Sequence, residues 1–441
     1  MDQNFMKERP IFPLVTAMSL PMVLSMLVNA LYNIVDSYFV AKISEEAMTA
    51  LSLVFPVQNA ATAVGVGFGI GINAAAAFFL GAGDKKKADS VITQGIVLSG
   101  VHGILLTISC MAFMPGFLKL FTEDPQVIRD GIAYSGIVFL FSTALTAGVA
   151  FEKIFQAVGM MKVSMACMLV GCVVNIVLDP ILIFGAGPLP SMGVRGAALA
   201  TGIGQAASLM AYIIVFVRKP LPVRFRLSRE VMREKVCRRI YLVGIPATLN
   251  IGLPSLLITA LNGMLAPFSQ MYVLILGIYY KLQTFIYLTA NGIVQGIRPL
   301  VGFNYGAGRG DRVKGILKVA LGLGAAIMAL GTVLCMVFPE MLMGLFSENP
   351  RTVGEGAKAL RIISCGFVVS TVSVIISGTF EGLGRGLPSL AISLIRYVAF
   401  IPVAFVLRGF FGVEGIWSGF AVTEVLAAAA SLFMLKRSRI L

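Results

Sequence analysis

The sequence predicts an all-α polytopic membrane protein with twelve transmembrane helices, arranged as two six-helix lobes. Three observations carry this prediction. Apolar residues make up 58% of the 441 residues, and charged residues only 13%, against about 25% in soluble domains. Apolar runs of 20 or more residues, each long enough to cross a bilayer as a helix, recur along the chain. The second half of the chain also repeats the first.

Gly- and Pro-rich breaks separate the predicted helices. We expect them at residues 14–40, 47–79, 90–115, 132–157, 163–185, 194–217, 240–264, 271–303, 314–338, 357–381, 388–407 and 413–435.

Basic residues are distributed unevenly between the loops. With the N-terminus in the cytoplasm, the cytoplasmic segments hold most of the Lys and Arg, and the segment 218–239 alone holds nine. This is the positive-inside pattern of a membrane protein. Topology and anionic lipid thus account for the net charge of +14, and we expect membrane lipid, but no nucleic acid, as a partner.

The repeat becomes visible when the second half of the chain is laid over the first. In one ungapped register, "LGAGDKKKAD" (80–89) aligns with "YGAGRGDRVK" (305–314), and "LFTEDP" (120–125) with "LFSENP" (345–350). Nearer the C-terminus the offset is shorter, and "GVRGAALA" (193–200) aligns with "GVEGIWSG" (412–419). Six helices per half means that both halves start on the same side, so the predicted lobes are related by a pseudo-two-fold axis along the membrane normal. We divide the chain into an N-terminal lobe (1–217), a basic cytoplasmic linker (218–239) and a C-terminal lobe (240–441).

A few ionisable groups lie within the apolar spans, and two of them are aspartates in the first half. Asp36 shares a helix face with Asn29 and Tyr32, and Asp179 lies four residues after Asn175 and directly before a proline. Topology places both aspartates in the outer half of the bilayer, at the depth of Thr201. We predict a cation site at Asp36, Asn175, Asp179 and Thr201, whose oxygen atoms suit a proton or Na⁺.

The second half lacks this cluster, because Leu261 aligns with Asp36 and Ala404 with Asp179. A purely structural role remains the alternative: the carboxylates would cap a broken helix or tie two helices, and the Thr201 hydroxyl would bond its own helix.

The other intramembrane polar residues have weaker assignments. We place six of them in a candidate substrate cavity: Asn29, Tyr32, Gln58, Lys281, Gln283 and Arg298. For Glu152 beside Lys153, and for Glu381 near Arg385, a local ion pair or snorkelling stands as an alternative to a functional role. Arg396 is the candidate partner of Glu424. His102, the only histidine, is expected to be a buried side chain with a hydrogen-bond partner.

The chain resembles the multidrug and toxin extrusion (MATE) family across nearly its full length. The resemblance rests on Asp36 after "NALYNIV", the paired "GAGD" and "YGAGRGDRVK" loops, "FQAVG" with "FEGLG", and "GVRGAALAT". It implies a cation-coupled exporter with a first-lobe cation site at Asp36, Asn175, Asp179 and Thr201. One branch of the family also uses a Glu in helix seven. This chain has none there, which brings it closer to the branch of the MepA-like drug exporters.

We therefore expect an antiporter of a bacterial inner membrane, with both termini in the cytoplasm, that acts as a monomer. It would couple entry of a proton or Na⁺ to export of small organic, cationic and lipophilic compounds by alternating access. A flippase for a lipid-linked saccharide or another amphipathic lipid precursor is the alternative, and Lys281, Arg298 and Arg396 favour its cationic cavity. An integral-membrane enzyme is a further alternative. The chain has no nucleotide-binding or HExxH motif, so we expect no enzymatic activity and no cofactor.

Overall fold

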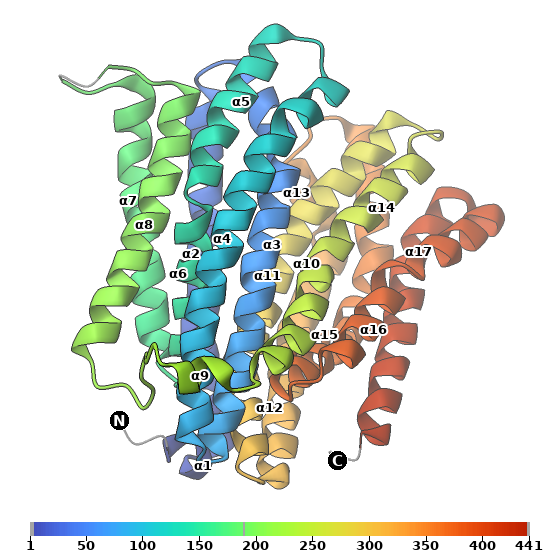
Figure 1. The fold of residues 1–441 in the computed structure, drawn as a ribbon. Helices are drawn as coiled ribbons and strands as arrows, with labels where there is room; N and C mark the ends of the chain where they lie inside the picture. Colours follow the sequence, from blue (N-terminus) through green and yellow to red (C-terminus); the bar gives the residue numbers. More distant parts are fainter. Residues whose placement is uncertain (1–3, 188–189, 439–441) are drawn as a thin grey trace. The chain divides into compact units, whose positions relative to one another are not determined.

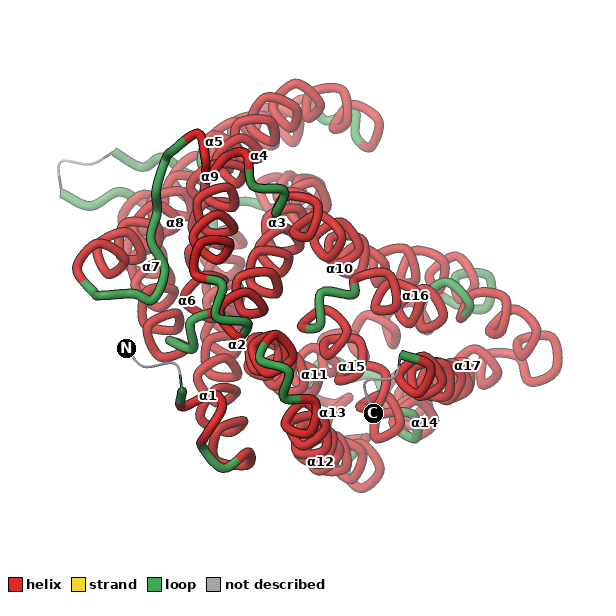
Figure 2. The backbone as a smooth tube through the Cα atoms, turned by 60° about the horizontal axis from the view of Figure 1, so that its bottom comes forward, coloured by secondary structure: helices red, strands yellow, loops and turns green. Residues whose placement is uncertain are grey.

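The computed structural model describes residues 4–187 and 190–438, and within these ranges every regular element is a helix (Figure 1). The helices of the first half are α1 (Phe5–Glu8), α2 (Ile11–Ala41), α3 (Glu45–Gly81), α4 (Lys85–Phe121), α5 (Pro125–Leu140), α6 (Ser142–Ala157), α7 (Met161–Phe184), α8 (Val194–Arg218) and α9 (Arg229–Arg233). Those of the second half are α10 (Cys237–Leu265), α11 (Gln270–Gly306), α12 (Gly310–Val337), α13 (Pro339–Gly344), α14 (Pro350–Ser364), α15 (Phe367–Gly382), α16 (Gly386–Tyr397) and α17 (Phe400–Arg437). Figure 2 shows that mostly short loops join them.

The twelve expected spans are all present, and three of them are divided between two helices: 132–157 (α5 and α6), 357–381 (α14 and α15) and 388–407 (α16 and α17). Nine helical stretches among the described residues are long and apolar enough to cross a membrane, and the bent pairs α5–α6 and α14–α15 bring the number to eleven. One of the nine, Gly386–Arg437, has 52 residues. At about 1.5 Å per residue it is far too long for one crossing of a hydrocarbon core about 30 Å thick. Its backbone leaves helical geometry at Gly412, so it contains the last two spans.

Two predicted single helices, 132–157 and 357–381, are instead helix pairs bent by 44° and 51°. The bends fall at Phe141 and at Cys365–Gly366. At the first bend Thr107 donates to the carbonyl of Phe139 at 2.7 Å, and at the second Thr332 donates to the carbonyl of Ser364 at 3.1 Å. Each threonine thus binds a carbonyl at the broken end of the preceding helix, where the regular helical partner is missing.

The backbone repeats between the halves as the sequence does. Helix N-caps recur in the register of the sequence repeat, as Ser44 with Ser269 and Asp124 with Asn349, and each of these side chains accepts a backbone N–H. Glycines with positive φ recur in the same way, in the pairs Gly83 and Gly308, Gly159 and Gly384, and, in the register of the C-terminal part, Gly193 and Gly412. The last pair has φ, ψ of 53°, −130° and 59°, −134°, a conformation that only glycine adopts readily.

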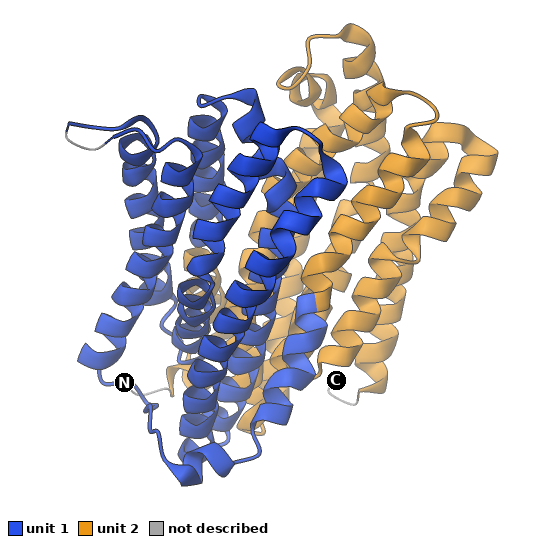
Figure 3. Cartoon of the chain, turned by 45° about the horizontal axis from the view of Figure 1, so that its top comes forward, with its two compact units in different colours: residues 1–3, 24–248 blue, residues 4–23, 249–441 orange. Residues whose placement is uncertain are grey.

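The described residues form two compact units, one of residues 24–248 and the other of residues 4–23 with 249–441 (Figure 3). The predicted linker 218–239 belongs to the first unit, where it is held against α4. The backbone N–H of Arg224 donates to Asp89 at 2.7 Å, and Gln94 donates to the carbonyl of Val231 at 2.6 Å. The start of α2 belongs to the second unit and the start of α10 to the first.

Candidate functional site

The predicted cation-site residues of the first half come from three helices of the first unit. Asp36 lies on α2, Asn175 and Asp179 on α7, and Thr201 on α8. Asp179 is fully buried, and Asn175 and Thr201 are 2% and 4% exposed. These three residues therefore lie in the interior of the unit, where an uncompensated charge is costly.

Glycines bring α7 and α8 close enough for these side chains to meet. A Cβ added to Gly204 would lie 2.8 Å from the carbonyl oxygen of Gly171 and 3.0 Å from the Cβ of Asn175. Contacts this short leave no room for a side chain at position 204, so the two backbones pack directly against each other. The close packing places Asn175 of α7 beside Thr201 of α8.

Asn175 joins the members of this cluster. With one orientation of its amide, it donates to Asp179 Oδ2 at 3.2 Å and accepts the Thr201 backbone N–H at 3.1 Å. With the other, it makes a single 3.4 Å contact to Thr201 Oγ1. The first orientation satisfies two polar groups and is the one we adopt. The expected i, i+4 pairing of Asn175 with Asp179 is thus a hydrogen bond.

Asp36 lies close enough to Asp179 for their charges to interact, and Tyr32 interacts electrostatically with both carboxylates. One oxygen of each carboxylate, Oδ1, is buried and accepts no hydrogen bond within the described part of the chain. Buried acceptors of this kind on two neighbouring carboxylates are chemically suited to a proton or a small hard cation.

Tyr134 of α5 belongs to the same cluster, and the sequence reasoning missed it. Its ring is buried, and its hydroxyl hydrogen bonds to Gln58 of α3 and interacts electrostatically with Asp36 and Asp179. A signal for it exists in the repeat, because the aligned residue of the second half is Ala359. Tyr134 is therefore, like the aspartates, a polar residue that only the first half has.

Of the remaining residues assigned to a substrate cavity, Asn29 belongs to the first unit, and Lys281, Gln283 and Arg298 belong to the second. Asn29 is exposed on α2, where its carbonyl oxygen and side chain accept from Asn33. Lys281 is exposed on α11, with its ammonium 5.8 Å from the ring centre of Phe346. Gln283 is partly buried on the same helix. Arg298, by contrast, is only 5% exposed.

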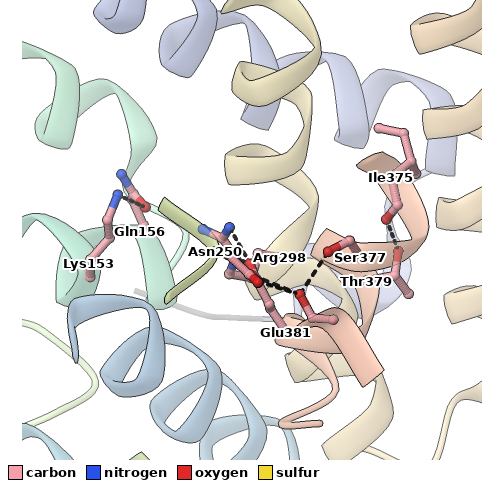
Figure 4. A network of polar contacts seen from close by, with 9 residues as sticks. Lys153, Gln156, Asn250, Arg298, Ile375, Ser377, Thr379 and Glu381 are labelled. Atoms are coloured by element: carbon pink, nitrogen blue, oxygen red, sulfur yellow. Dashed lines mark hydrogen bonds and ion pairs between the residues drawn. The ribbon is translucent and has the colours of Figure 1, made fainter. Parts of the chain in front are cut away.

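The second unit places Arg298 in an ion pair with Glu381 of α15 (Figure 4). Arg298 Nε and Nη2 donate to Glu381 Oε2 at 3.1 and 2.7 Å. The other carboxylate oxygen, Oε1, accepts from Asn250 of α10 at 3.3 Å and from Ser389 of α16 at 3.1 Å. The alternative of a local ion pair between Glu381 and Arg385 is therefore wrong, because the guanidinium of Arg298 on a neighbouring helix pairs with the carboxylate.

The first unit also has a polar network at the equivalent positions, where the aligned side chains are uncharged. In the register of the repeat Asn73 aligns with Arg298, Gln156 with Glu381 and Ser164 with Ser389. Gln156 donates to Ser164 at 3.4 Å, much as Ser389 donates to Glu381. The same fold positions thus hold a polar network in both units. In the first unit its charges come from neighbouring residues, because Gln156 donates to Glu152 at 2.7 Å and accepts from Lys153 at 3.3 Å. In the second unit Arg298 and Glu381 themselves carry the charges.

The other expected side-chain pairings are present. Lys153 contacts Glu152 at 2.7 Å, and Arg396 Nε donates to Glu424 at 2.6 Å. His102 shares a 2.9 Å hydrogen bond with the Tyr241 hydroxyl of α10 and is partly buried. Glu152, Glu424 and His102 thus each have a partner within the protein.

Repeated six-helix halves with apolar spans and buried polar clusters define a multi-pass membrane protein of the carrier type. A family model described as MatE matches residues 21–181 and, a second time, residues 246–406. The two matches lie in the same register as the sequence repeat and together cover more than half of the chain. The chain belongs to this family of multidrug efflux transporters.

Individual relatives agree with this assignment over almost the whole length. The chain is 27% identical to a protein named "Multidrug export protein MepA" of Staphylococcus haemolyticus (strain JCSC1435), across 98% of this chain and 94% of the relative. It is 26% identical to the protein of that name from Staphylococcus aureus (strain MRSA252), with the same coverage.

Solved structures share the fold. A MOP superfamily transporter from Pyrococcus furiosus superimposes with a TM-score of 0.90 at 24% identity, over 100% of this chain and 98% of the other. A MATE crystallised in complex with MaD5 gives a TM-score of 0.90 at 25% identity, over 97% of this chain and 95% of the other. The twelve-helix architecture expected from the sequence is therefore that of known MATE structures.

Proposed function

We propose that this chain is an antiporter of a bacterial inner membrane that exports organic, cationic and lipophilic compounds by coupling to inward movement of a proton or Na⁺. Membership of the MATE family and the printed names of its relatives as multidrug export proteins support this proposal. The bias of basic residues supports an orientation with both termini in the cytoplasm. We also propose that the transporter functions as a monomer.

The observation that carries the coupling proposal is the pair of aspartates in the first unit. Asp179 is completely buried, interacts with the charge of Asp36, and keeps one carboxylate oxygen without a hydrogen-bond donor in the described structure. Two such carboxylates titrate as a coupled pair. In our proposal, binding of a cation between them removes their mutual repulsion, and Asn175 and Thr201 complete the set of polar ligands.

Coupling requires that the ion and the substrate stabilise different arrangements of the protein. The aspartates lie on α2 and α7, so neutralising them changes how strongly these two helices repel each other. In the proposed cycle the ion enters from outside, the packing of the first unit changes, and the substrate site is exposed to the outside for release.

The test is dye export from proteoliposomes in which a pH gradient and a Na⁺ gradient are imposed separately. Asp36→Asn and Asp179→Asn each remove one ionisable group with almost no change in volume. We expect gradient-driven export to fall to the background of empty liposomes, while dye binding remains. Asp311→Asn, an exposed carboxylate at the start of α12, is the matched control and should export normally. Export at the normal rate by both aspartate variants would refute the coupling proposal.

The flippase alternative rested on three cations that were expected to line one cavity. Arg298 and Arg396 are instead paired with Glu381 and Glu424 inside the second unit. Their charges are thus neutralised by the protein itself, and Lys281 remains as a single cation. This is not the strongly cationic surface that a diphosphate would require, so we retain the exporter proposal.

A further inference from the structure

A large groove opens on the side of the first unit, outside the carboxylate cluster. It has a volume of about 840 Å³ and lies where α4, α6 and α8 meet the segment that follows α8. Apolar side chains of the three helices form its walls, among them Phe151, Phe216 and Val217. Val217 and Ile213 are 77% and 37% exposed although they lie on a membrane-spanning helix. The walls therefore face the acyl chains of the membrane.

Cations form the rim of the groove at the end where α8 leaves the membrane. Lys219, Arg224 and Arg226 all line it, and all three are exposed. None of them forms an ion pair with any residue between 4 and 187 or between 190 and 438. The carboxylate of Asp89 lies beside them, but one of its oxygens already accepts the backbone N–H of Arg224. The rim consequently has an excess of positive charge.

The rim is held in place before any ligand binds. The backbone N–H groups of Arg224 and Arg226 donate to Asp89 and Thr93 of α4, at 2.7 and 3.1 Å. The side chain of Val223, directly before them, is buried. Backbone anchoring fixes the path of the segment and leaves the guanidinium groups free, so binding a ligand would order only side chains.

We propose that this groove binds an anionic phospholipid from the leaflet at the basic end of the spans. Its acyl chain would lie along the apolar walls, and its phosphate would contact Lys219, Arg224 and Arg226. The combination of an apolar cleft with an unpaired cationic rim at a membrane boundary matches this chemistry, because arginine and lysine at such a boundary attract anionic headgroups. A lipophilic cation of the exported kind would be repelled by the same rim.

The first experiment measures lipid binding to the purified full-length chain by native mass spectrometry in detergent. Phosphatidylglycerol and phosphatidylcholine with identical oleoyl chains are added separately. We expect phosphatidylglycerol to remain bound at collision energies that remove phosphatidylcholine. Glycerol phosphate, which has the headgroup charge but no chains, should not compete, because the apolar walls contribute to binding.

Charge variants test the rim. Replacing Lys219, Arg224 or Arg226 singly by Gln should weaken phosphatidylglycerol binding about fivefold, which corresponds to the usual contribution of one surface cation. The triple variant should lose the preference over phosphatidylcholine. The matched control replaces Lys85, Lys436 and Arg437 by Gln, since these three cations are exposed and none of them lines the groove.

A second variant tests the walls without changing charge. Gly100 of α4 lines the groove, and a Cβ added there would have no atom within 4 Å. Gly100→Phe should therefore fill the groove without disturbing the packing of the unit, and it should reduce lipid retention. Gly116→Phe on the same helix, also in open space, is its control.

Loss of lipid selectivity in the rim and wall variants, with both controls unchanged, would support the proposal. Equal retention of the two lipids by the unaltered protein would overturn it. So would an equal loss in the control triple variant, because binding would then depend on total charge rather than on this groove. A photoactivatable phosphatidylglycerol that labels peptides outside α4, α6, α8 and residues 219–226 would overturn it as well.

Discussion

The buried ion pair of the second unit allows a sharp prediction about stability. Glu381 is 6% and Arg298 5% exposed, so neither charge is solvated by water. Glu381→Gln removes the negative charge and keeps the shape. Its amide has one acceptor oxygen, whereas the carboxylate uses two oxygens to accept from Arg298 on one side and from Asn250 and Ser389 on the other. The variant therefore keeps only one of these two acceptors and leaves the buried guanidinium without a counter-charge.

The expected loss of stability in Glu381→Gln follows from the burial of both charged side chains. Breaking a buried ion pair by removing one partner costs about 3–5 kcal/mol, and we take the lower end, about 3 kcal/mol, because the amide keeps one of the acceptors. For a unit of this size the thermal midpoint should fall by roughly 6–12 °C. The double variant Arg298→Gln/Glu381→Gln should recover at least half of this loss, since the pair is then neutral and the two amides can bond to each other.

The assay is thermal unfolding of the full chain in detergent, followed by the change in a fluorescent reporter of exposed cysteine. Glu340→Gln is the control, because Glu340 forms an exposed ion pair with Arg361 at 2.9 Å with both side chains about half exposed. Such a pair contributes at most about 1 kcal/mol, so the midpoint should move little. An equal shift in Glu381→Gln and Glu340→Gln, or a double variant as unstable as the single one, would refute the reasoning.

Three further predictions concern single residues. A Cβ added at Gly412 or at Gly409 would meet no atom within 4 Å, so the two positions differ in backbone conformation and not in available space. Gly412→Ala should lower the free energy of unfolding by about 1–3 kcal/mol, because its φ is positive, whereas Gly409→Ala should be neutral or slightly stabilising in the same thermal assay. Gly204→Ala should separate α8 from α7 and lower both the thermal midpoint and gradient-driven export; unchanged export would show that close packing there is dispensable. Asp84 caps α4, and the hydrogen bond from the Lys87 backbone N–H lowers the pKa of its carboxyl. Asp84→Ala should cost about 1 kcal/mol at neutral pH. Because the pKa is lower in the folded chain, this difference should begin to shrink below a pH of about 4, where the unfolded carboxyl takes up a proton, and it should be lost only when the folded carboxyl is protonated too. A difference that did not shrink below a pH of about 4 would contradict the assignment.

The fold was largely predictable because hydropathy and the repeat are strong signals. The repeat aligned Ser44 with Ser269 and Asp124 with Asn349, and the structure shows these residues in the same capping roles. The bend at Phe141 was not predictable, because no proline or glycine lies there. It depends on a threonine of another helix, Thr107, and residue propensities contain no information about such a partner.

In the polar clusters too, contacts within one helix were predictable from the sequence and contacts between helices were not. The bond of Asn175 with Asp179 follows from their i, i+4 spacing, which any helix brings together. The partner of Glu381 is 83 residues away on another helix, and local spacing favoured Arg385 instead. The alignment of the two halves did contain information about this ion pair, because the second half has Arg298 and Glu381 where the first half has the uncharged Asn73 and Gln156. Two opposite charges that appear together in one half indicate an ion pair, and an interpretation of each helix by itself does not use this signal.

The division of α2 and α10 between the two units has a mechanical consequence. Each is one continuous helix, yet the boundary between the units crosses α2 after residue 23 and α10 after residue 248. Pro21 and Pro246 lie two residues before these crossings, and each lacks the N–H that would bond the preceding turn. Helices bend most readily where that bond is absent. Any rotation of one unit against the other must therefore be absorbed by two matched hinges, and the first of them lies on the helix that also holds Asp36.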